Sequence, residues 1–180
     1  MSKKVLVISS SLRPNSNSEA LADAFAEGAA SVGDEVEKIS LRGKNIGFCR
    51  GCLACQELGH CVINDGALEI AEKMLHADVL VFATPIYYYE MSGQLKTLLD
   101  RVNSLFASDY AFRDAYFLST AMVDEPSTDE RAVHGFEGWV ICYENCRLAG
   151  TVFAGGVDGA GEIAGHPALE EARAMGAAIK

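Results

Sequence analysis

The first strand-like segment of the chain runs directly into a polar loop, in the stretch Val5-Leu6-Val7-Ile8-Ser9-Ser10-Ser11-Leu12-Arg13-Pro14-Asn15-Ser16-Asn17-Ser18. A short continuous apolar run such as residues 5–8 is typical of a strand that is covered on both faces. After the loop, apolar residues recur at helical spacing as far as Val32, and Gly33 follows where a helix would stop. The stretch therefore predicts a buried strand, a polar loop and a helix, which is the repeating unit of α/β proteins.

The same alternation continues along the rest of the chain. We predict further strands over residues 36–41, 77–83, 116–123 and 148–154, with helices that end near His76, Phe106, Glu144 and Ile179. Five strands that alternate with helices indicate an α/β fold with a doubly wound parallel sheet. No repeat or linker is visible, so we predict one domain over residues 1–180, in which residues 43–64 form a cysteine-rich loop.

Composition and net charge argue against some classes of partner. The 180 residues are 49% hydrophobic and 22% charged, which is typical of a globular protein, and the formal net charge is −10. This charge argues against nucleic acid and anionic membranes as partners, since both attract basic surfaces. The sequence shows neither an apolar run of about 20 residues nor an export signal, so we expect a cytoplasmic protein whose six cysteines are reduced.

The loop after the first strand has the chemistry of an anion site. In a doubly wound sheet, ligands bind beyond the carboxyl ends of the strands. Hydroxyls, a small amide and free backbone N–H groups precede the helix, whose dipole favours negative charge, and Arg13 adds a cationic fork. Neither a Walker loop nor a G-x-G-x-x-G fingerprint is present. The alternative interpretation is that Asn17 or Ser18 only caps the helix.

A second informative loop follows the third strand, in the stretch Thr84-Pro85-Ile86-Tyr87-Tyr88-Tyr89-Glu90-Met91-Ser92-Gly93-Gln94-Leu95-Lys96. We expect Pro85 to end the strand and Ser92 to cap the next helix. Flat rings and backbone amides at this edge suit a planar heterocycle. The alternative interpretation is that the tyrosines are packing residues at a domain edge or a dimer contact. The end of the fourth strand could place Met122 or Val123 beside the same ligand.

Together, these two loops and the cysteine row between them resemble the flavodoxin-like NAD(P)H-dependent FMN reductase family, and in particular its iron–sulfur flavoprotein branch. The resemblance runs over nearly the whole chain. It implies a five-stranded parallel sheet in the order 2-1-3-4-5 that binds FMN, and a homodimer or tetramer. By this likeness the phosphate contacts are Ser11, Arg13, Ser16, Asn17 and Ser18, and the isoalloxazine contacts are Pro85, Ile86, Tyr87, Tyr88, Met91 and Ser92.

The cysteine row has three interpretations. Its four thiols, in the pattern C-x2-C-x2-C-x5-C, are Cys49, Cys52, Cys55 and Cys61. They supply the number of ligands that one [4Fe–4S] cluster requires. Zinc also takes four thiolates, but usually from two separated pairs. The third interpretation is a loop of free thiols near the flavin. Cys142 and Cys146, four residues apart on a predicted helix, are expected to be core residues on one face.

Three functional hypotheses follow from these features. The first is an FMN-dependent oxidoreductase that passes electrons from NAD(P)H to a quinone, a flavin or a similar small acceptor. No protein acid or base is nominated for it, because hydride transfer to a flavin depends mainly on stacking and distance. The second is an electron carrier with FMN and one [4Fe–4S] cluster that serves ferredoxin-type partners. The third is a protein that uses the flavodoxin-like fold to bind a ligand and carries out no electron transfer.

Overall fold

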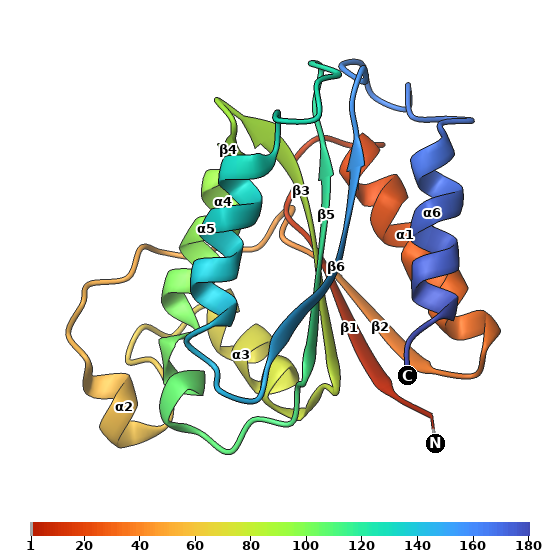
Figure 1. Ribbon diagram of the computed structural model, residues 1–180. Helices are drawn as coiled ribbons and strands as arrows, with labels where there is room; N and C mark the ends of the chain where they lie inside the picture. The colour runs from red at the N-terminus through yellow and green to blue at the C-terminus, as the bar shows by residue number, and fades with distance from the viewer. Residues whose placement is uncertain (1) are drawn as a thin grey trace.

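A parallel sheet in the order β2-β1-β3-β5-β6 forms the centre of the computed structural model, which describes residues 2–180 (Figure 1). Counted among the parallel strands alone, this is the predicted order 2-1-3-4-5. A short strand, β4, pairs antiparallel with the end of β3 and was not predicted. The strands are β1 (Lys4–Ser9), β2 (Glu35–Ser40), β3 (Val79–Tyr87), β4 (Glu90–Met91), β5 (Asp114–Thr120) and β6 (Arg147–Ala154).

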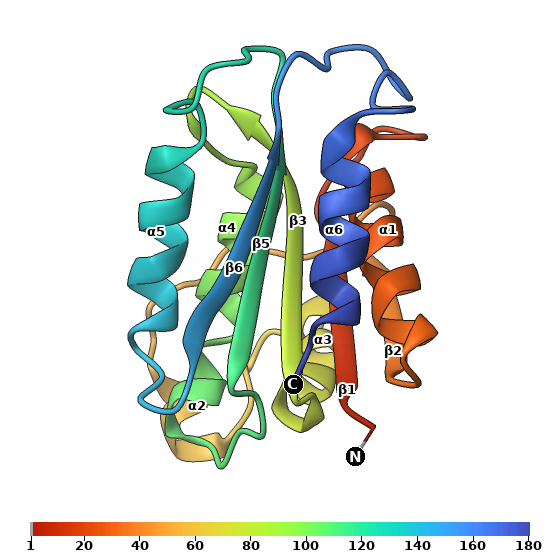
Figure 2. The ribbon, with the colours of Figure 1, turned by 45° about the vertical axis from the view of Figure 1, so that its right-hand side comes forward.

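Helices cover both faces of the sheet, as Figure 2 shows. One face carries α1 and α6, and the other carries α3, α4 and α5. Strand β1 shows why its apolar run is continuous: Val5 and Val7 pack on the first face, while Leu6 and Ile8 pack on the second. The helices are α1 (Asn17–Ser31), α2 (Ala54–Leu58), α3 (Gly66–His76), α4 (Gly93–Arg101), α5 (Glu130–Val140) and α6 (Pro167–Ala177), with a 3₁₀ helix, η1 (Asn103–Ala107).

Helices α1 and α6 pack unusually closely because glycines lie at their contact. A Cβ atom on Gly176 would lie 2.2 Å from the carbonyl oxygen of Phe25, and one on Gly28 would lie 2.0 Å from that of Arg173. Only glycine permits backbones to approach so closely. This packing seats α1 firmly on the sheet, and the amino end of α1 is the part that carries the polar loop.

Side chains cap two helix starts, and the cap at Ser92 confirms the prediction. The carboxylate of Asp65 accepts a hydrogen bond from the backbone N–H of Ala67, at 3.0 Å, and α3 begins at the next residue after Asp65. The hydroxyl of Ser92 accepts one from the N–H of Leu95, at 3.3 Å, at the start of α4. Each side chain satisfies a backbone donor that has no partner within its helix.

The expected end of β3 at Pro85 was wrong, because the strand continues to Tyr87. Strand β1 pairs with β3 only as far as Ala83, so one side of β3 is already unpaired at Pro85. On its other side, Pro85 still lies in register with Thr120 of β5. Proline is tolerated where a strand has become an edge, since no ladder hydrogen bond is lost on the free side.

The expected helix as far as Glu144 was also too long. Helix α5 ends at Val140, and i+3 hydrogen bonds such as that from Cys146 N–H to the Tyr143 carbonyl turn the chain into β6. The chain must reverse here to enter the sheet at Arg147. As a result, Cys142 is exposed and Cys146 is only partly buried, so the prediction of two core residues on one helix face was wrong.

Candidate functional site

A pocket of about 310 Å³ opens at the carboxyl edge of the sheet, at the upper end of the molecule in Figure 1. Loops that follow β1, β3, β5 and β6 meet there, as expected for the ligand crevice of a doubly wound fold. The lining includes nine of the eleven predicted flavin contacts, namely Ser11, Arg13, Ser16, Asn17, Ser18, Pro85, Ile86, Tyr87 and Tyr88. The two loops that the sequence singles out therefore enclose one space.

The polar loop presents the amino end of α1 to this pocket. Ser16 caps the helix, since its Oγ accepts a hydrogen bond of 3.2 Å from the N–H of Glu19. The interpretation in which Asn17 or Ser18 serves only as the cap was therefore wrong. Ser18 is buried, and its Oγ has no hydrogen-bond partner. A buried hydroxyl without a partner is rare in proteins. Beside a helix N-terminus, it is suited to an anionic group in the pocket.

Asn17 and Arg13 are tied to the loop that follows β6. The Asn17 amide donates to the Gly159 carbonyl at 2.9 Å, and its oxygen accepts from the N–H of Ile163 at 3.2 Å. Arg13 donates to the carbonyl oxygen of Asp158. These contacts hold the loops after β1 and β6 together, so both residues help to shape the pocket as well as line it.

A tight corner follows β3. Tyr87 pairs with Glu90, so Tyr88 and Tyr89 form a two-residue turn between β3 and β4. Both have positive φ, at 52° and 67°. Such turns normally contain asparagine or glycine, and a bulky residue there is strained. Strain of this kind persists where neighbouring structure enforces it, and it is commonly found at functional sites.

Met91 and Ser92 do not line the pocket but lie beneath this corner. Both are buried. The N–H of Ser92 donates to Thr84 Oγ1 at 3.0 Å, and its hydroxyl donates to Ser10 Oγ at 2.9 Å. The short strand β4, which the sequence did not reveal, turns these residues inward. They support the corner from below in this structure.

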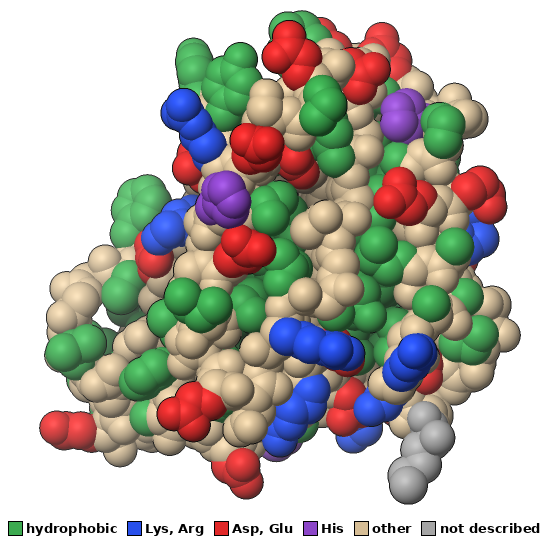
Figure 3. Space-filling view, viewed as in Figure 1, with side chains coloured by type: hydrophobic (Ala, Val, Ile, Leu, Met, Phe, Trp, Pro, Cys, Tyr) green, Lys and Arg blue, Asp and Glu red, His purple; other side chains and the backbone are tan. Residues whose placement is uncertain are grey.

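The far wall of the pocket comes from residues that the two sequence motifs do not contain. Thr120 is the last residue of β5, Ala121 and Met122 follow it, and Val157 and Asp158 follow β6. Of these, only Met122 was anticipated, because it lies at a strand end. Figure 3 shows acidic side chains gathered over these loops. Asp124, Glu125 and Asp158 are exposed there, so an anion in the pocket must be held by local donors.

A second, much smaller cavity lies in the cysteine-rich loop. It has a volume of about 30 Å³, and all four cysteines of the row contribute to its wall, together with Asp100, Arg101 and Asn103. Cys49 and Cys52 are exposed, while Cys55 and Cys61 are partly buried. The Nδ2 group of Asn103 donates to the sulfur of Cys55 at 3.4 Å. Cys55 lies in α2, which is at the end of the molecule away from the carboxyl edge of the sheet (Figure 1).

Arg101, in the last turn of α4, is the buried charge of this region. Its guanidinium forms a fork with Asp65, with contacts of 2.7 and 3.0 Å. Hydrogen bonding to Asp65 is the main cause that raises the pKa of Arg101. Burial lowers this pKa, and the neighbouring Cys61 thiol raises it further. Burial raises the pKa of Asp65, but hydrogen bonds from Arg101, Gly47 and Ala67 outweigh it and hold that pKa below its usual value. The pair is therefore ionised at neutral pH.

The donors around this cavity are of the kind that a metal centre uses. Among residues 2–180, no three His, Cys, Asp or Glu side chains are already placed to hold a metal ion. The number and type of ligands nevertheless match one [4Fe–4S] cluster. The Nε atom of Arg101 is buried and has no partner, so a donor is available for a negatively charged group. The residues present therefore fit a cluster in chemistry, although the loop must rearrange to admit one.

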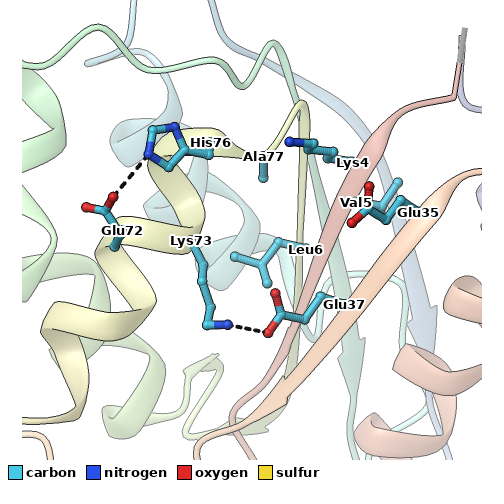
Figure 4. A pocket seen from close by; sticks show the side chains of 9 residues that line it. All are labelled: Lys4, Val5, Leu6, Glu35, Glu37, Glu72, Lys73, His76 and Ala77. Carbon is cyan, nitrogen blue, oxygen red and sulfur yellow. Dashed lines mark hydrogen bonds and ion pairs between the residues drawn. The ribbon is translucent and has the colours of Figure 1, made fainter.

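A third hollow, of about 250 Å³, lies at the opposite edge of the sheet (Figure 4). There Lys73 contacts Glu37 at 2.6 Å and His76 contacts Glu72 at 3.1 Å. The hydrogen bond to Glu37 raises the pKa of Lys73. Glu37, Glu72 and His76 are exposed, and such exposed pairs are typical of a solvated surface. This hollow carries no functional assignment.

No helix within residues 2–180 combines the length and the apolar character required to cross a membrane.

The model of a family described as NADPH-dependent FMN reductase matches residues 3–135. An iron–sulfur flavoprotein of Methanocaldococcus jannaschii is 41% identical over 102 residues, which cover 57% of this chain and 53% of that protein. An iron–sulfur flavoprotein of Methanosarcina thermophila is 28% identical over 96% of this chain and 87% of its own length. The chain thus spans about half of the first relative and nearly all of the second.

Solved structures share the whole fold. A NAD(P)H:quinone oxidoreductase from Methanothermobacter marburgensis superposes with a TM-score of 0.76 at 18% identity and covers 100% of both chains. An azoreductase from Bacillus anthracis superposes with a TM-score of 0.73 at 17% identity and covers 98% of this chain and 100% of its own. At these identities the likeness shows the flavodoxin-like fold.

Proposed function

The chain belongs to the NADPH-dependent FMN reductase family, and on this basis we propose that it is an FMN-dependent oxidoreductase that passes electrons from NAD(P)H to a small acceptor. One observation carries the proposal. The anion-type loop after β1 and the tyrosine corner after β3 form one pocket at the carboxyl edge of the sheet. The first is suited to a phosphate and the second to a planar ring.

The phosphate of FMN is assigned to the amino end of α1. Ser11, Arg13, Ser16, Asn17 and Ser18 surround this end. The unpartnered hydroxyl of Ser18 and the first free N–H groups of the helix supply donors, and the helix dipole adds favourable potential. These local donors offset the net negative charge of the chain.

The ring is assigned to the corner formed by Pro85, Ile86, Tyr87 and Tyr88, with Thr120, Ala121 and Met122 on the opposite wall. When bound, FMN supplies the group that accepts a hydride from NAD(P)H and returns electrons to the acceptor. The residues of the chain bind the ring, orient it and exclude water from one of its faces. We assign no protein acid or base, since positioning is the main requirement of hydride transfer.

The acceptor is proposed to be a quinone, a flavin or a similar small aromatic molecule. Tyr88 is 98% exposed and Met122 is 65% exposed, so the rim of the pocket offers apolar surface to a flat molecule. The same rim could be covered by another copy of the chain, in line with the homodimer or tetramer expected from the family resemblance. The proposal places the protein in the reducing cytoplasm, where its six thiols stay reduced.

A titration of the purified chain with FMN, followed by an assay of NAD(P)H oxidation with a soluble quinone, tests this function. We expect one FMN per chain and quinone-dependent oxidation of the nucleotide. A chain that binds no FMN contradicts the assignment. A chain that binds FMN but does not react with NADH or NADPH contradicts the reductase and favours the second candidate.

The second candidate is an electron carrier that combines FMN with one [4Fe–4S] cluster and serves ferredoxin-type partners. It is favoured by the four thiols that share one cavity with a buried arginine. Because a cavity of about 30 Å³ is close to the volume of a single water molecule, the loop must open to load the cluster. Protein prepared without oxygen should then contain about four irons and four sulfides per chain. Zinc in place of iron, or thiols without metal, would contradict this candidate.

A further inference from the structure

One side chain holds both ends of the cysteine-rich segment. The Nη1 group of Arg101 donates to the carbonyl oxygen of Gly47 at 2.7 Å, and its Nη2 group donates to that of Ile63 at 3.1 Å. Gly47 precedes the first cysteine of the row by two residues, and Ile63 follows the last by two residues. The segment of residues 48–62 is therefore closed at its base by a single guanidinium group.

Asp65 fixes this guanidinium in place. Its two carboxylate oxygens accept from the two terminal nitrogens of Arg101, and one of them also accepts from the N–H of Gly47 at 2.9 Å. The Arg101 side chain has no exposed surface, and that of Asp65 is 8% exposed. A planar fork of this kind fixes orientation as well as charge, which a lysine could not do. The anchor is thus rigid and independent of the cysteines.

The remaining donor of Arg101 has no partner. Its guanidinium group carries five N–H donors. The four on the terminal nitrogens are accounted for by Gly47, Ile63 and the two oxygens of Asp65. The fifth, on Nε, is buried and forms no hydrogen bond. Arg101 lines the same cavity as the four cysteines.

We propose that Arg101 is the positioning residue of the cysteine site, closing the loop through Gly47 and Ile63 and reserving its Nε–H donor for a cysteine sulfur of a loaded centre. The second half of this proposal rests on the iron–sulfur candidate described above. Thiols bind iron as thiolates, so loading places negative charge beside the guanidinium. An N–H donor to a ligand sulfur favours the more negative, reduced state and raises the reduction potential of the centre.

The variant Arg101→Lys tests the first half without any metal. It keeps the positive charge but cannot reach Gly47, Ile63 and Asp65 together. The matched control is Arg113→Lys, because Arg113 also donates to three backbone carbonyls, those of Tyr110, Ala111 and Phe112, but lines neither pocket. Amide hydrogen exchange of the metal-free, FMN-bound chain reports the opening of residues 48–62 directly.

We expect exchange in residues 48–62 to rise at least tenfold in Arg101→Lys and to remain unchanged in Arg113→Lys. FMN affinity should be the same in both, since neither residue lines the flavin-type pocket. Unchanged exchange in Arg101→Lys overturns the positioning role. If that variant does not fold, Asp65→Asn decides: asparagine still caps α3 but leaves the guanidinium without its counter-charge. Faster exchange in the same segment supports the role, and unchanged exchange overturns it.

Reconstitution with iron and sulfide without oxygen tests the second half. We expect Arg101→Lys to retain less than half of the iron of the parent chain. In the cluster that remains, the equilibrium between the oxidised and reduced forms should shift about tenfold toward the oxidised form. For a one-electron couple this lowers the reduction potential by about 59 mV. Equal iron content and equal potential overturn the role of Nε. A parent chain that takes up no iron overturns the cluster candidate and this half of the proposal, while the exchange experiment still decides the first half.

Discussion

The hydroxyl of Ser92 donates a 2.9 Å hydrogen bond to the hydroxyl of Ser10, although 82 residues separate them. Both side chains are fully buried. Ser10 begins the loop that is suited to a phosphate, and Ser92 lies under the tyrosine corner and caps α4. This hydrogen bond therefore joins the two halves of the pocket and fixes the distance between them.

Removal of this link should weaken both stability and ligand binding. Ser92→Ala deletes the cap of α4 and removes the donor to the Ser10 hydroxyl, which keeps only its own hydrogen bond to the carbonyl oxygen of Ala83. We therefore expect a loss of about 2 kcal/mol in the free energy of unfolding. FMN affinity should also fall, because the corner is no longer held to the loop. Urea denaturation and fluorescence titration with FMN measure the two effects. Ser31→Ala, which loses a bond at the exposed end of α1, should change neither by a comparable amount.

Loss of the charge at Arg13 should reduce FMN affinity with little effect on stability. Arg13 is exposed at the rim, and Arg13→Gln removes one charge-assisted contact to the phosphate. We therefore expect the dissociation constant of FMN to rise about tenfold. Arg173→Gln is the charge-matched control, since Arg173 pairs with Glu27 and Glu170 away from the pocket. Equal FMN affinity of Arg13→Gln and the control would show that the phosphate has been misplaced.

The two strained tyrosines should separate backbone strain from ligand binding. Tyr88→Gly and Tyr89→Gly each relieve a positive φ, which we expect to stabilise the fold by about 1 kcal/mol, as seen by thermal denaturation. Only Tyr88 lines the pocket. FMN affinity should therefore fall in Tyr88→Gly and stay the same in Tyr89→Gly. An equal loss in both variants would mean that the turn conformation, rather than the Tyr88 ring, contributes to binding.

The Arg101–Asp65 pair should give the chain an acid-labile component of stability. The pKa of Asp65 is lower in the folded chain than its ordinary value of 3.8. Its contribution is therefore fully present above about pH 3.8 and is lost as pH falls through the lowered folded-state value. At pH 6, Asp65→Asn should cost about 3 kcal/mol, because it leaves a buried charge unpaired.

Urea denaturation between pH 6 and pH 2 measures this dependence. The difference in the free energy of unfolding between the parent chain and Asp65→Asn should shrink as pH falls below 3.8. A difference that is constant with pH would show that the carboxylate charge of Asp65 does not stabilise the folded chain.

Features of the fold that depend on local pattern were predictable from sequence. A few neighbouring residues are enough to determine each of three features: the apolar run of β1, the caps at Asp65 and Ser92, and the polar loop before α1. The nine pocket residues that were predicted belong to such segments. Pro85 was misleading because its tolerance in β3 depends on where β1 ends, which is a property of the sheet and not of the local sequence.

The remaining parts of the site depend on tertiary structure. Four lining residues carry no motif: Thr120, Ala121, Val157 and Asp158. They reach the pocket only because β5 ends beside β3 and β6 ends beside β5. The separation of the cysteine cavity from the pocket follows from α4, which has Ser92 at one end and Arg101 at the other. Its nine residues span roughly 13 Å. Spacing in the sequence alone could not show that the row lies by the far end of this helix.

A crystal structure of the chain grown with saturating FMN tests the central claim most directly. The account predicts density for the phosphate at the amino end of α1, within hydrogen-bond distance of Ser18 Oγ, and for the ring against Pro85, Ile86 and Tyr88. An empty pocket under these conditions, or FMN bound at another place on the chain, would contradict it.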